Sequence, residues 1–457
     1  MGALGAVPSK DRSVEPLKPS DMFNWAPYHS ILRDVKTIKT YGRVVQVIGM
    51  VAEGMGPRSA IGDLCHIQKR GEEIPIPAEI VGFRDSKMLL MPLGNTRGIE
   101  PGCQIIPMGS PAQVQVGHPL LGRVLDALGS PIDHGGPLAL EAQYPLYSEP
   151  PHPLLRKRIS VPVDVGIKAI NGLLTLGKGQ RIAIFSGSGV GKSILLGMMA
   201  RHTAAQVSVV ALIGERGREV REFIEKDLGE EGLKRSVVIV ATSDQPPLIR
   251  MRGAYFATVV AEYFRDCGHD VLLMMDSITR FAMAAREVGL AIGEPPTSKG
   301  YTPSVFAQLP KLLERVGMTS GQGSITGIYN VLVEGDDVSE PISDAIRSIA
   351  DGHILLSRDL ANQNHYPAID VLGSISRVMI DIADKDHLSA RNRLVSLMAS
   401  YKRAEDLIQI GAYVAGSNPQ VDDAIKMMPE IDMFLCQGID EKINFEDSVK
   451  QLKSLFH

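Results

Sequence analysis

The pattern of apolar positions divides the chain into regions of different character. Between residues 41 and 110, short aliphatic runs such as VVQVIGMV and KMLLMPL are separated by glycines. Brief apolar runs at regular spacing, interrupted by glycine, are typical of a small β-barrel. No stripe of aromatic or basic residues follows these runs, so we do not expect this region to bind oligonucleotides.

Residues 111–380 alternate strongly apolar runs with helical patterns. The runs SVVALIG, SVVIVAT, DVLLMMD and SITGIYNVLV indicate buried parallel strands, and the intervening GAYFATVVAEYFRDCG indicates a helix. This alternation predicts an α/β domain with a mostly parallel sheet. Four prolines within residues 141–160 mark an irregular connection inside the domain.

Residues 381–457 are predicted to be helical. Leu394, Leu397, Met398 and Tyr401 recur at the spacing of one helix face. Further helix starts are expected at Asn418, which precedes a proline, and at Asn444, which lies three residues before an aspartate. The region carries 13 acidic and 9 basic side chains, a balance that favours protein partners over nucleic acid.

Residues 1–40 form an N-terminal extension. Three prolines and few apolar residues predict that its first half is mobile. Ile31, Val35 and Ile38 would share one face of a short helix. That helix would either pack against the next domain or dock a partner protein.

Composition narrows the class of protein without identifying it. The 457 residues are 44% apolar, and 48 basic side chains are balanced by 52 acidic ones. The apolar content is sufficient for the cores of several globular domains. The balanced charge means that the chain has no overall positive potential to attract nucleic acid. Four cysteines lack the spacing of disulfides or metal ligands, and the N-terminus has no signal-peptide pattern. No uninterrupted apolar stretch reaches about 18 residues. We therefore expect a cytoplasmic protein.

The most informative segment is RIAIFSGSGVGKS, residues 181–193. An apolar strand would run into a glycine-rich loop whose backbone N–H groups surround a phosphate. Lys192 would neutralise the β- and γ-phosphates, and the Ser193 hydroxyl would be a ligand for Mg²⁺. The loop that would form this cradle consists of Ser186, Gly187, Ser188, Gly189, Val190 and Gly191. Ser186 departs from the strict pattern, which has glycine there, and a plain strand-to-helix turn is the alternative.

Two carboxylates follow apolar runs in the same domain. Asp276 ends the run VLLMMD, which would place it at the carboxyl edge of a sheet, where it could hold a hydrated Mg²⁺. Its alternative role is to cap the next helix. Glu215 follows SVVALIG and could orient or deprotonate an attacking water. Arg216 and Arg218 follow it at once, so a solvated charge cluster is the alternative.

The segment QNHYPAIDVLGSISRV, residues 363–378, adds an aromatic and a basic candidate. Tyr366 offers a ring on which an adenine could stack. Arg377 lies in an apolar strand context, where a guanidinium needs an anion. That anion is either a carboxylate of the same chain or a nucleotide bound on a neighbouring subunit.

Together and in this order, these segments resemble the catalytic subunits of the rotary ATPase and type III export ATPase superfamily. The sequence PAID at 367–370, with Ser374 and Ser376 after it, matches the signature of that superfamily. The resemblance spans about residues 41–457. Within the superfamily, four stretches are similar to the flagellar protein export ATPases: residues 241–255, 276–317, 331–360 and 410–419.

The resemblance implies a fold and a set of residue roles. The fold is a small N-terminal β-barrel (41–110), a central RecA-like P-loop ATPase domain (111–380) and a C-terminal helical domain (381–457). Lys192 and Ser193 would bind phosphate and Mg²⁺, Asp276 would be the metal-site aspartate, and Glu215 the catalytic carboxylate. The supporting residues would be Arg216, Glu219 and Arg280. The two faces of adenine would be contacted by Tyr366 and Tyr413, and the arginine finger would be Arg377.

The resemblance also implies a function and partners. It predicts Mg²⁺-dependent ATP hydrolysis by a homohexameric ring that energises flagellar type III protein export at the inner face of the cell membrane. The implied partners are a regulator or stator-like protein at the N-terminus, a stalk-like protein at the helical domain, export-gate membrane proteins, and export substrates with their chaperones. The alternatives are an ATPase of a virulence injectisome, a rotary synthase catalytic subunit, an RNA translocase resembling transcription termination factor Rho, and a nucleotide-binding scaffold without turnover.

Overall fold

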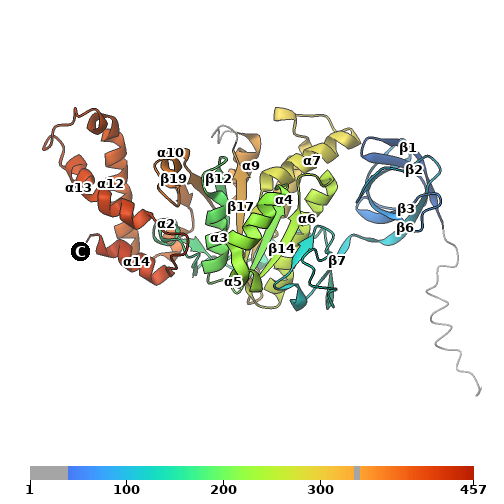
Figure 1. The fold of residues 1–457 in the computed structure, drawn as a ribbon, viewed down its shortest axis with the longest axis horizontal. Coiled ribbons are helices and arrows are strands. Elements are labelled where there is room, and N and C mark those ends of the chain that lie inside the picture. Colours follow the sequence, from blue (N-terminus) through green and yellow to red (C-terminus); the bar gives the residue numbers. More distant parts are fainter. Residues whose placement is uncertain (1–39, 334–339, 457) are drawn as a thin grey trace, which may run out of the picture.

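The computed structural model describes residues 40–333 and 340–456, and their three regions follow one another along the long axis of the molecule (Figure 1). The barrel lies at one end, the large sheet in the middle, and the last helices at the other end. The helix expected around Ile31, Val35 and Ile38 lies outside the described residues. None of the described helices combines the length and the apolar character needed to cross a bilayer.

Six antiparallel strands close into the N-terminal barrel, as the sequence predicted. Their order around the barrel is β1-β2-β5-β4-β3-β6. Alternate side chains, among them Val44, Ile67 and Leu90, fill the interior, which is the expected pattern for strands that face solvent on one side. The strands are β1 (Gly42–Ile48), β2 (Val51–Met55), β3 (Asp63–Gln68), β4 (Ile76–Arg84), β5 (Lys87–Pro92) and β6 (Gln104–Pro111).

A buried ion pair fixes the barrel to the central domain. Arg252, on a central helix, donates to Glu79 Oε2 of β4 at 2.7 Å, and both side chains are buried. The Tyr147 hydroxyl donates to the other carboxylate oxygen at 2.8 Å. Removing one partner of such a pair would leave an uncompensated buried charge, so these contacts hold the two regions together.

The central sheet has nine strands in the order β19-β18-β12-β17-β15-β13-β14-β8, with β16 paired to β17. Most neighbours are parallel, and the antiparallel pairs are β18 with β19 and β16 with β17. The mostly parallel sheet predicted from the sequence is therefore confirmed. Its strands are β8 (Val124–Asp126), β12 (Arg181–Ser186), β13 (Val207–Ile213), β14 (Ser236–Ala241), β15 (Asp270–Asp276), β16 (Gly317–Met318), β17 (Ser324–Leu332), β18 (Gly352–Leu356) and β19 (Ile369–Ser376).

Each face of this sheet packs against its own set of helices. Along β12, Ala183 and Phe185 join one core while Ile182 and Ile184 join the other, because successive side chains of a strand point to opposite faces. The first core contains α6 (Pro247–Asp266), α7 (Ile278–Ile292), α8 (Pro303–Leu313) and α9 (Pro341–Ile349). The second contains α2 (Lys168–Leu173), α3 (Lys192–His202) and η4 (Phe223–Leu228), and α4 (Gly217–Glu222) and α5 (Gly229–Lys234) flank η4.

Shorter elements connect these layers. Strands β7 and β9 pair with each other, and they lie before and after β8 in the chain. Strand β10 pairs with β11 ahead of the glycine-rich loop. The segments are β7 (Gln113–Val116), η2 (His118–Leu120), β9 (Ala142–Pro145), η3 (Pro153–Leu155), β10 (Pro162–Val163), β11 (Leu176–Gly177), η5 (Ser298–Gly300), α10 (Arg358–Asn362) and α11 (Met379–Ile382).

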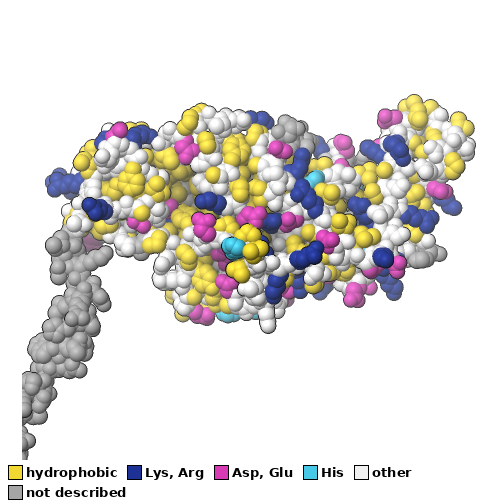
Figure 2. Space-filling view, turned by 180° about the vertical axis from the view of Figure 1, so that it is seen from behind, with side chains coloured by type: hydrophobic (Ala, Val, Ile, Leu, Met, Phe, Trp, Pro, Cys, Tyr) yellow, Lys and Arg dark blue, Asp and Glu magenta, His cyan; other side chains and the backbone are white. Residues whose placement is uncertain are grey.

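The C-terminal region is helical and rests on the second core through Leu394, Phe434 and Leu452. It consists of α12 (Lys385–Gln409), α13 (Pro419–Leu435) and α14 (Phe445–Ser454). The side chain of Asn418 accepts from Gln420 N, and that of Asn444 accepts from Asp447 N, so both predicted helix starts are confirmed. On the surface, acidic and basic side chains are interspersed with apolar ones over the face shown in Figure 2.

Candidate active site

The glycine-rich loop joins the end of β12 to the start of α3. Gly189 and Gly191 have φ angles of 79° and 84°, a left-handed conformation that glycine adopts without strain. Gly191 is also the N-cap of α3, which begins at Lys192. The loop therefore directs backbone N–H groups and the positive end of a helix toward the same place, as anion binding requires.

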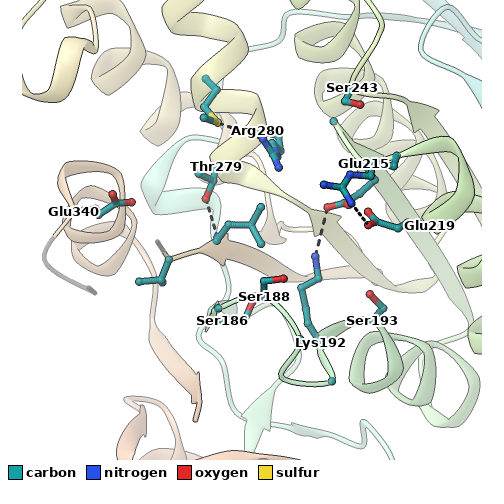
Figure 3. A pocket seen from close by; sticks show the side chains of 18 of the residues that line it. Ser186, Ser188, Lys192, Ser193, Glu215, Glu219, Ser243, Thr279, Arg280 and Glu340 are labelled. Atoms are coloured by element: carbon teal, nitrogen blue, oxygen red, sulfur yellow. Dashed lines mark hydrogen bonds and ion pairs between the residues drawn. The ribbon is translucent and has the colours of Figure 1, made fainter. Parts of the chain in front are cut away.

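Lys192, Ser193 and Glu215 line a cavity of about 840 Å³ at the carboxyl edge of the central sheet (Figure 3). Glu215 arrives two residues after the end of β13, and Asp276 is the last residue of β15. Ser277, and not Asp276, caps α7 by accepting from Arg280 N. The capping alternative for Asp276 is therefore wrong, and its carboxylate faces the loop instead.

Lys192 lies between the two carboxylates. Its Nζ donates to Asp276 Oδ1 at 2.8 Å and lies 3.4 Å from Glu215 Oε1. Burial acts to lower the pKa of Lys192, but the charges of Asp276 and Glu215 outweigh it, and the net shift is upward. The ammonium therefore keeps its positive charge at neutral pH, as a phosphate-binding lysine requires.

Glu215 has the pKa of a proton acceptor suited to neutral pH. The pKa of its carboxyl is raised from 4.5 to about 7, chiefly by burial and next by the nearby negative charge of Asp276. Lys192 opposes this shift, while a hydrogen bond with Glu219 supports it and lowers the pKa of Glu219. A general base is most effective when its pKa lies near the working pH.

Ser193 and Asp276 supply the donor set that Mg²⁺ takes in nucleotide sites. Ser193 lies in the first turn of α3 and lines the cavity. One hydroxyl and one carboxylate are few ligands, but Mg²⁺ keeps several waters and takes its other ligands from substrate phosphates. Within the described residues there is no cluster of three or more His, Cys, Asp or Glu that could hold a metal by itself. The residues present fit a nucleotide-associated Mg²⁺.

The predicted supporting residues border the same cavity. The side chain of Arg216, the N-cap of α4, is 81% exposed and lies 3.6 Å from that of Glu219 in the first turn of the helix. Arg280, on α7, also lines the cavity, and its buried Nε has no hydrogen-bond partner among the described residues. An incoming anion would be attracted by both guanidinium groups.

Several lining residues were missed by the sequence analysis. Arg358 follows the end of β18 and donates to the carbonyl of Ser188 at 3.2 Å, which ties α10 to the glycine-rich loop. The rule that located Glu215 and Asp276, a polar residue directly after an apolar strand, would also have found Arg358. The other missed lining residues are Ile194, Gly214, Ser243, Thr279, Met283, Arg286, Lys299, Tyr301, Leu332, Val333 and Glu340.

Tyr366 borders a second cavity of about 610 Å³, on the other side of Gly191. A Cβ added to Gly191 would lie 3.2 Å from Tyr366 Cε1, so the ring packs closely against the glycine-rich loop. Aliphatic and other uncharged residues form most of the walls, which suits the face of a purine. They include Ile194, Leu195, Met198, Pro367 and the segment 436–439.

Two predicted site residues do not join these cavities. The Tyr413 hydroxyl lies 3.0 Å from Asp422 Oδ1 and 3.1 Å from the Asn418 carbonyl, in a separate pocket between α12 and α13. Tyr413 therefore lines a different pocket from Tyr366, and its role as the second adenine face stays a prediction. Arg377 lies one residue beyond β19 rather than within it, and donates to the carbonyl oxygens of Ala350 and Arg347.

A glycine-rich loop at the edge of a mostly parallel sheet, with a lysine inside it and acidic residues after two neighbouring strands, defines a P-loop nucleoside triphosphatase. Family models agree with this class. The ATP synthase alpha/beta family nucleotide-binding domain matches residues 166–376, and the beta-barrel domain of that family matches 44–109. The T3SS EscN ATPase C-terminal domain matches residues 383–454.

Individual relatives agree over most of the chain. The chain is 54% identical to the flagellum-specific ATP synthase of Bacillus subtilis over 420 residues, 91% of this chain and 95% of that protein. It also resembles the assembled type III secretion ATPase EscN of enteropathogenic E. coli, with a TM-score of 0.86, 45% identity, and coverage of 91% and 100% of the two chains. EscN in complex with its central stalk EscO gives a TM-score of 0.84 at 44% identity, with the same coverage. The chain therefore belongs to the family of flagellum-specific ATP synthases and type III secretion ATPases, and it is a P-loop ATPase.

Proposed function

We propose that this chain hydrolyses ATP with Mg²⁺ to energise or prime flagellar type III protein export. The observation that carries the proposal is the position of Lys192. This residue lies at the start of α3, bonded to Asp276 at 2.8 Å and 3.4 Å from Glu215. One side chain thus connects the phosphate loop with both acidic residues that the reaction requires.

Each residue has a role that its place in the site permits. The loop N–H groups and Lys192 bind the phosphates, and Glu215, with its pKa near 7, accepts a proton from the attacking water. Arg216 and Arg280 add positive charge at the cavity, with Glu219 holding Arg216. Tyr366 provides the surface on which adenine stacks.

Ser193 and Asp276 would hold the Mg²⁺. When bound, the ion neutralises developing negative charge on the phosphates. Asp276 contributes its carboxylate from the end of a buried strand, and Lys192 donates a hydrogen bond to one of its oxygens. Glu215 lies close enough to share this network, so the site holds a fixed set of charges before substrate arrives.

Arg377 is proposed to serve a neighbouring subunit of a homohexameric ring. Within the described residues it lines neither the cavity beside Lys192 nor the one beside Tyr366, and it lies just beyond β19, the edge strand of the sheet. An assembled form is the subject of the EscN structure that this chain resembles. A ring of identical subunits would place this arginine from one chain at the nucleotide of the next.

The proposed partners follow the three regions of the chain. A stalk-like protein would contact the C-terminal helical domain, in keeping with the EscN structure that contains the stalk EscO. A regulator or stator-like protein would bind the N-terminal extension. Export-gate membrane proteins, export substrates and their chaperones would complete the assembly, at the cytoplasmic face of the cell membrane.

A virulence injectisome is the second candidate setting, since the C-terminal helical domain matches the EscN family model. The two settings share the same site chemistry, so ATPase assays do not separate them. Deletion of the gene in its native cell does. Loss of flagellar filaments with intact effector secretion supports the flagellar setting, and the reverse result contradicts it.

The enzymatic part of the proposal is tested by phosphate release from the purified full-length chain, with Mg²⁺ and with a chelator. Lys192→Ala should lose turnover and bind ATP more weakly, because the loop then lacks its charge. Lys178→Ala is the matched control. Lys178 also bonds an aspartate, Asp270, but it lies at the opposite edge of the sheet. Normal turnover by folded Lys192→Ala protein would overturn the proposal.

A further inference from the structure

Asn330 is a buried polar residue in the middle of the central sheet and is not among the residues that line the cavity beside Lys192. It lies on β17, between the strand that leads into the phosphate loop and the strand that ends at Asp276. Its side chain has no exposure to solvent, and its strand neighbours are almost all apolar. An amide in such a place is stable only when its donors and acceptors are satisfied.

The amide of Asn330 bridges two segments of the active site. Its Nδ2 donates to Asp276 Oδ1 at 2.7 Å, and its Oδ1 lies 3.0 Å from the hydroxyl of Ser186. Because Asp276 is an acceptor when ionised, the amide must present its nitrogen to Asp276 and its oxygen to Ser186. The Ser186 hydroxyl is then the donor, and it fixes which way the amide faces.

Asp276 thereby has one oxygen held from two sides. Oδ1 accepts from both Asn330 and Lys192, at 2.7 and 2.8 Å. Oδ2 takes part in neither bond, so it is the oxygen that remains for a metal ion or its bound water. Without Asn330, the carboxylate could rotate about its bond to Cβ and follow Lys192 alone.

We infer that Asn330 is a positioning residue which, oriented by Ser186, holds the Asp276 carboxylate in the orientation that Mg²⁺ requires. This inference rests on the proposed function, because it takes Asp276 as the metal-site aspartate. It also gives a reason for the serine at a position where the strict phosphate-loop pattern has glycine: glycine has no hydroxyl to orient the amide.

The test measures how nucleotide affinity depends on Mg²⁺, a quantity that does not require ATP hydrolysis. ADP with a fluorescent ribose label is bound to the full-length chain, and the affinity is followed while Mg²⁺ is titrated. In Asn330→Ala, the Mg²⁺ concentration that gives half of the maximal change in nucleotide affinity should rise about tenfold. A change of this size corresponds to the loss of one hydrogen bond to a charged group. Affinity for the label in the presence of a chelator should stay near that of the wild type, because the phosphate loop is unchanged.

Ser186→Ala provides a milder variant and a check on the mechanism. The amide loses its orienting donor but can still reach Asp276, so the Mg²⁺ midpoint should rise about threefold. Adding Ser186→Ala to Asn330→Ala should cause no further change, because the hydroxyl acts only through the amide. If the double variant showed the sum of the two single effects on the Mg²⁺ midpoint, Ser186 would not act through Asn330.

Thr326→Val is the matched control on the same strand. It removes a buried side-chain acceptor of Gly179 N at the other end of β17, and is expected to lower the melting temperature without moving the Mg²⁺ midpoint. A wild-type midpoint in folded Asn330→Ala protein would overturn the inference, and if that variant fails to fold, a wild-type midpoint in Ser186→Ala would do so. A wild-type chain that shows no Mg²⁺ effect on nucleotide binding would instead overturn the proposed metal site itself.

Discussion

Gly191 and Tyr366 are in contact although 175 residues separate them in the sequence. A Cβ on Gly191 would lie 3.2 Å from Tyr366 Cε1 and 3.4 Å from Cδ1, and the φ angle of 84° at Gly191 already excludes most side chains. The contact brings the phosphate loop and the segment that carries the superfamily signature to one place. The elements proposed to bind the phosphates and the base are therefore parts of one packed unit.

The position of Tyr366 leads to a kinetic prediction. Tyr366→Ala removes a surface that contacts the base equally in the bound substrate and in the transition state. We expect the KM for ATP to rise several-fold with a smaller change in kcat, measured by steady-state phosphate release. Tyr366→Phe, which keeps the ring, should remain close to the wild type. An unchanged KM together with a collapsed melting temperature would show that Tyr366 is a packing residue.

The sequence predicts residues within local motifs better than it predicts the distant residues that contact those motifs. Lys192 and Ser193 were predictable because the residues that shape their loop are adjacent in the chain. Glu215 and Asp276 were predictable because polar residues after buried strands gather at one edge of a parallel sheet. The barrel, the parallel sheet and the terminal helices followed from hydrophobic periodicity in the same way.

The position of Asn330 in the site could not be predicted from a local motif or from its place at the end of a strand. It lies inside the apolar run SITGIYNVLV, where it looks like an isolated buried amide. It reaches Asp276 and Ser186 because β17 lies between β12 and β15, an order that the sequence of the strands does not reveal. The pocket that Tyr413 lines could not be predicted for a related reason. Its position depends on the turn between two helices, where Asp422 holds its hydroxyl.

Glu215→Gln should separate binding from hydrolysis. Glutamine keeps the size and hydrogen bonding of glutamate but cannot accept a proton, so ATP should still bind while turnover falls by about 10² or more. Glu222→Gln is the control, since Glu222 lies on the exposed side of α4, paired with Arg218 at 3.0 Å. Phosphate release near the wild-type rate from Glu215→Gln would place Glu215 in a surface charge cluster.

The raised pKa of Glu215 predicts a pH-dependent cost to stability. The folded state holds this proton up to about pH 7, whereas an unfolded chain releases it near 4.5. The contribution of Glu215 to the free energy of unfolding is therefore fully present below pH 4.5 and is lost as the pH rises through 7. Nucleotide-free Glu215→Gln should melt at a higher temperature than the wild type at pH 8, and the difference should vanish toward pH 4.5. Equal melting temperatures at pH 8 would contradict the raised pKa.

The same pKa predicts the acid limb of activity. Glu215 must be ionised to accept a proton, so kcat/KM should fall as the pH drops below about 7. The profile is measured at saturating Mg²⁺, with the melting temperature followed in parallel to exclude acid unfolding. A flat profile from pH 8 to pH 5 would mean that another group takes the proton.

Arg377 gives the sharpest test of a shared site. An arginine finger can supply about 10³–10⁵ in rate where a neighbouring subunit brings it to the phosphates. Arg377→Ala should therefore bind ATP and be nearly inactive, and wild-type specific activity should rise with protein concentration as subunits assemble. Both are measured by phosphate release over a concentration series, with assembly followed by light scattering.

Mixing two inactive variants shows whether the arginine acts between chains. In rings formed from Arg377→Ala and Glu215→Gln subunits, some interfaces join an intact Glu215 to an intact Arg377 from the next chain, so activity should partly return. A mixture of Lys192→Ala with Glu215→Gln is the control, because those two residues line the same cavity of one chain and no interface can restore both. An arginine acting within its own chain gives no recovery in the mixture of Arg377→Ala with Glu215→Gln, since no single subunit there carries both Glu215 and Arg377. Mixed rings without recovered activity would therefore exclude the shared site.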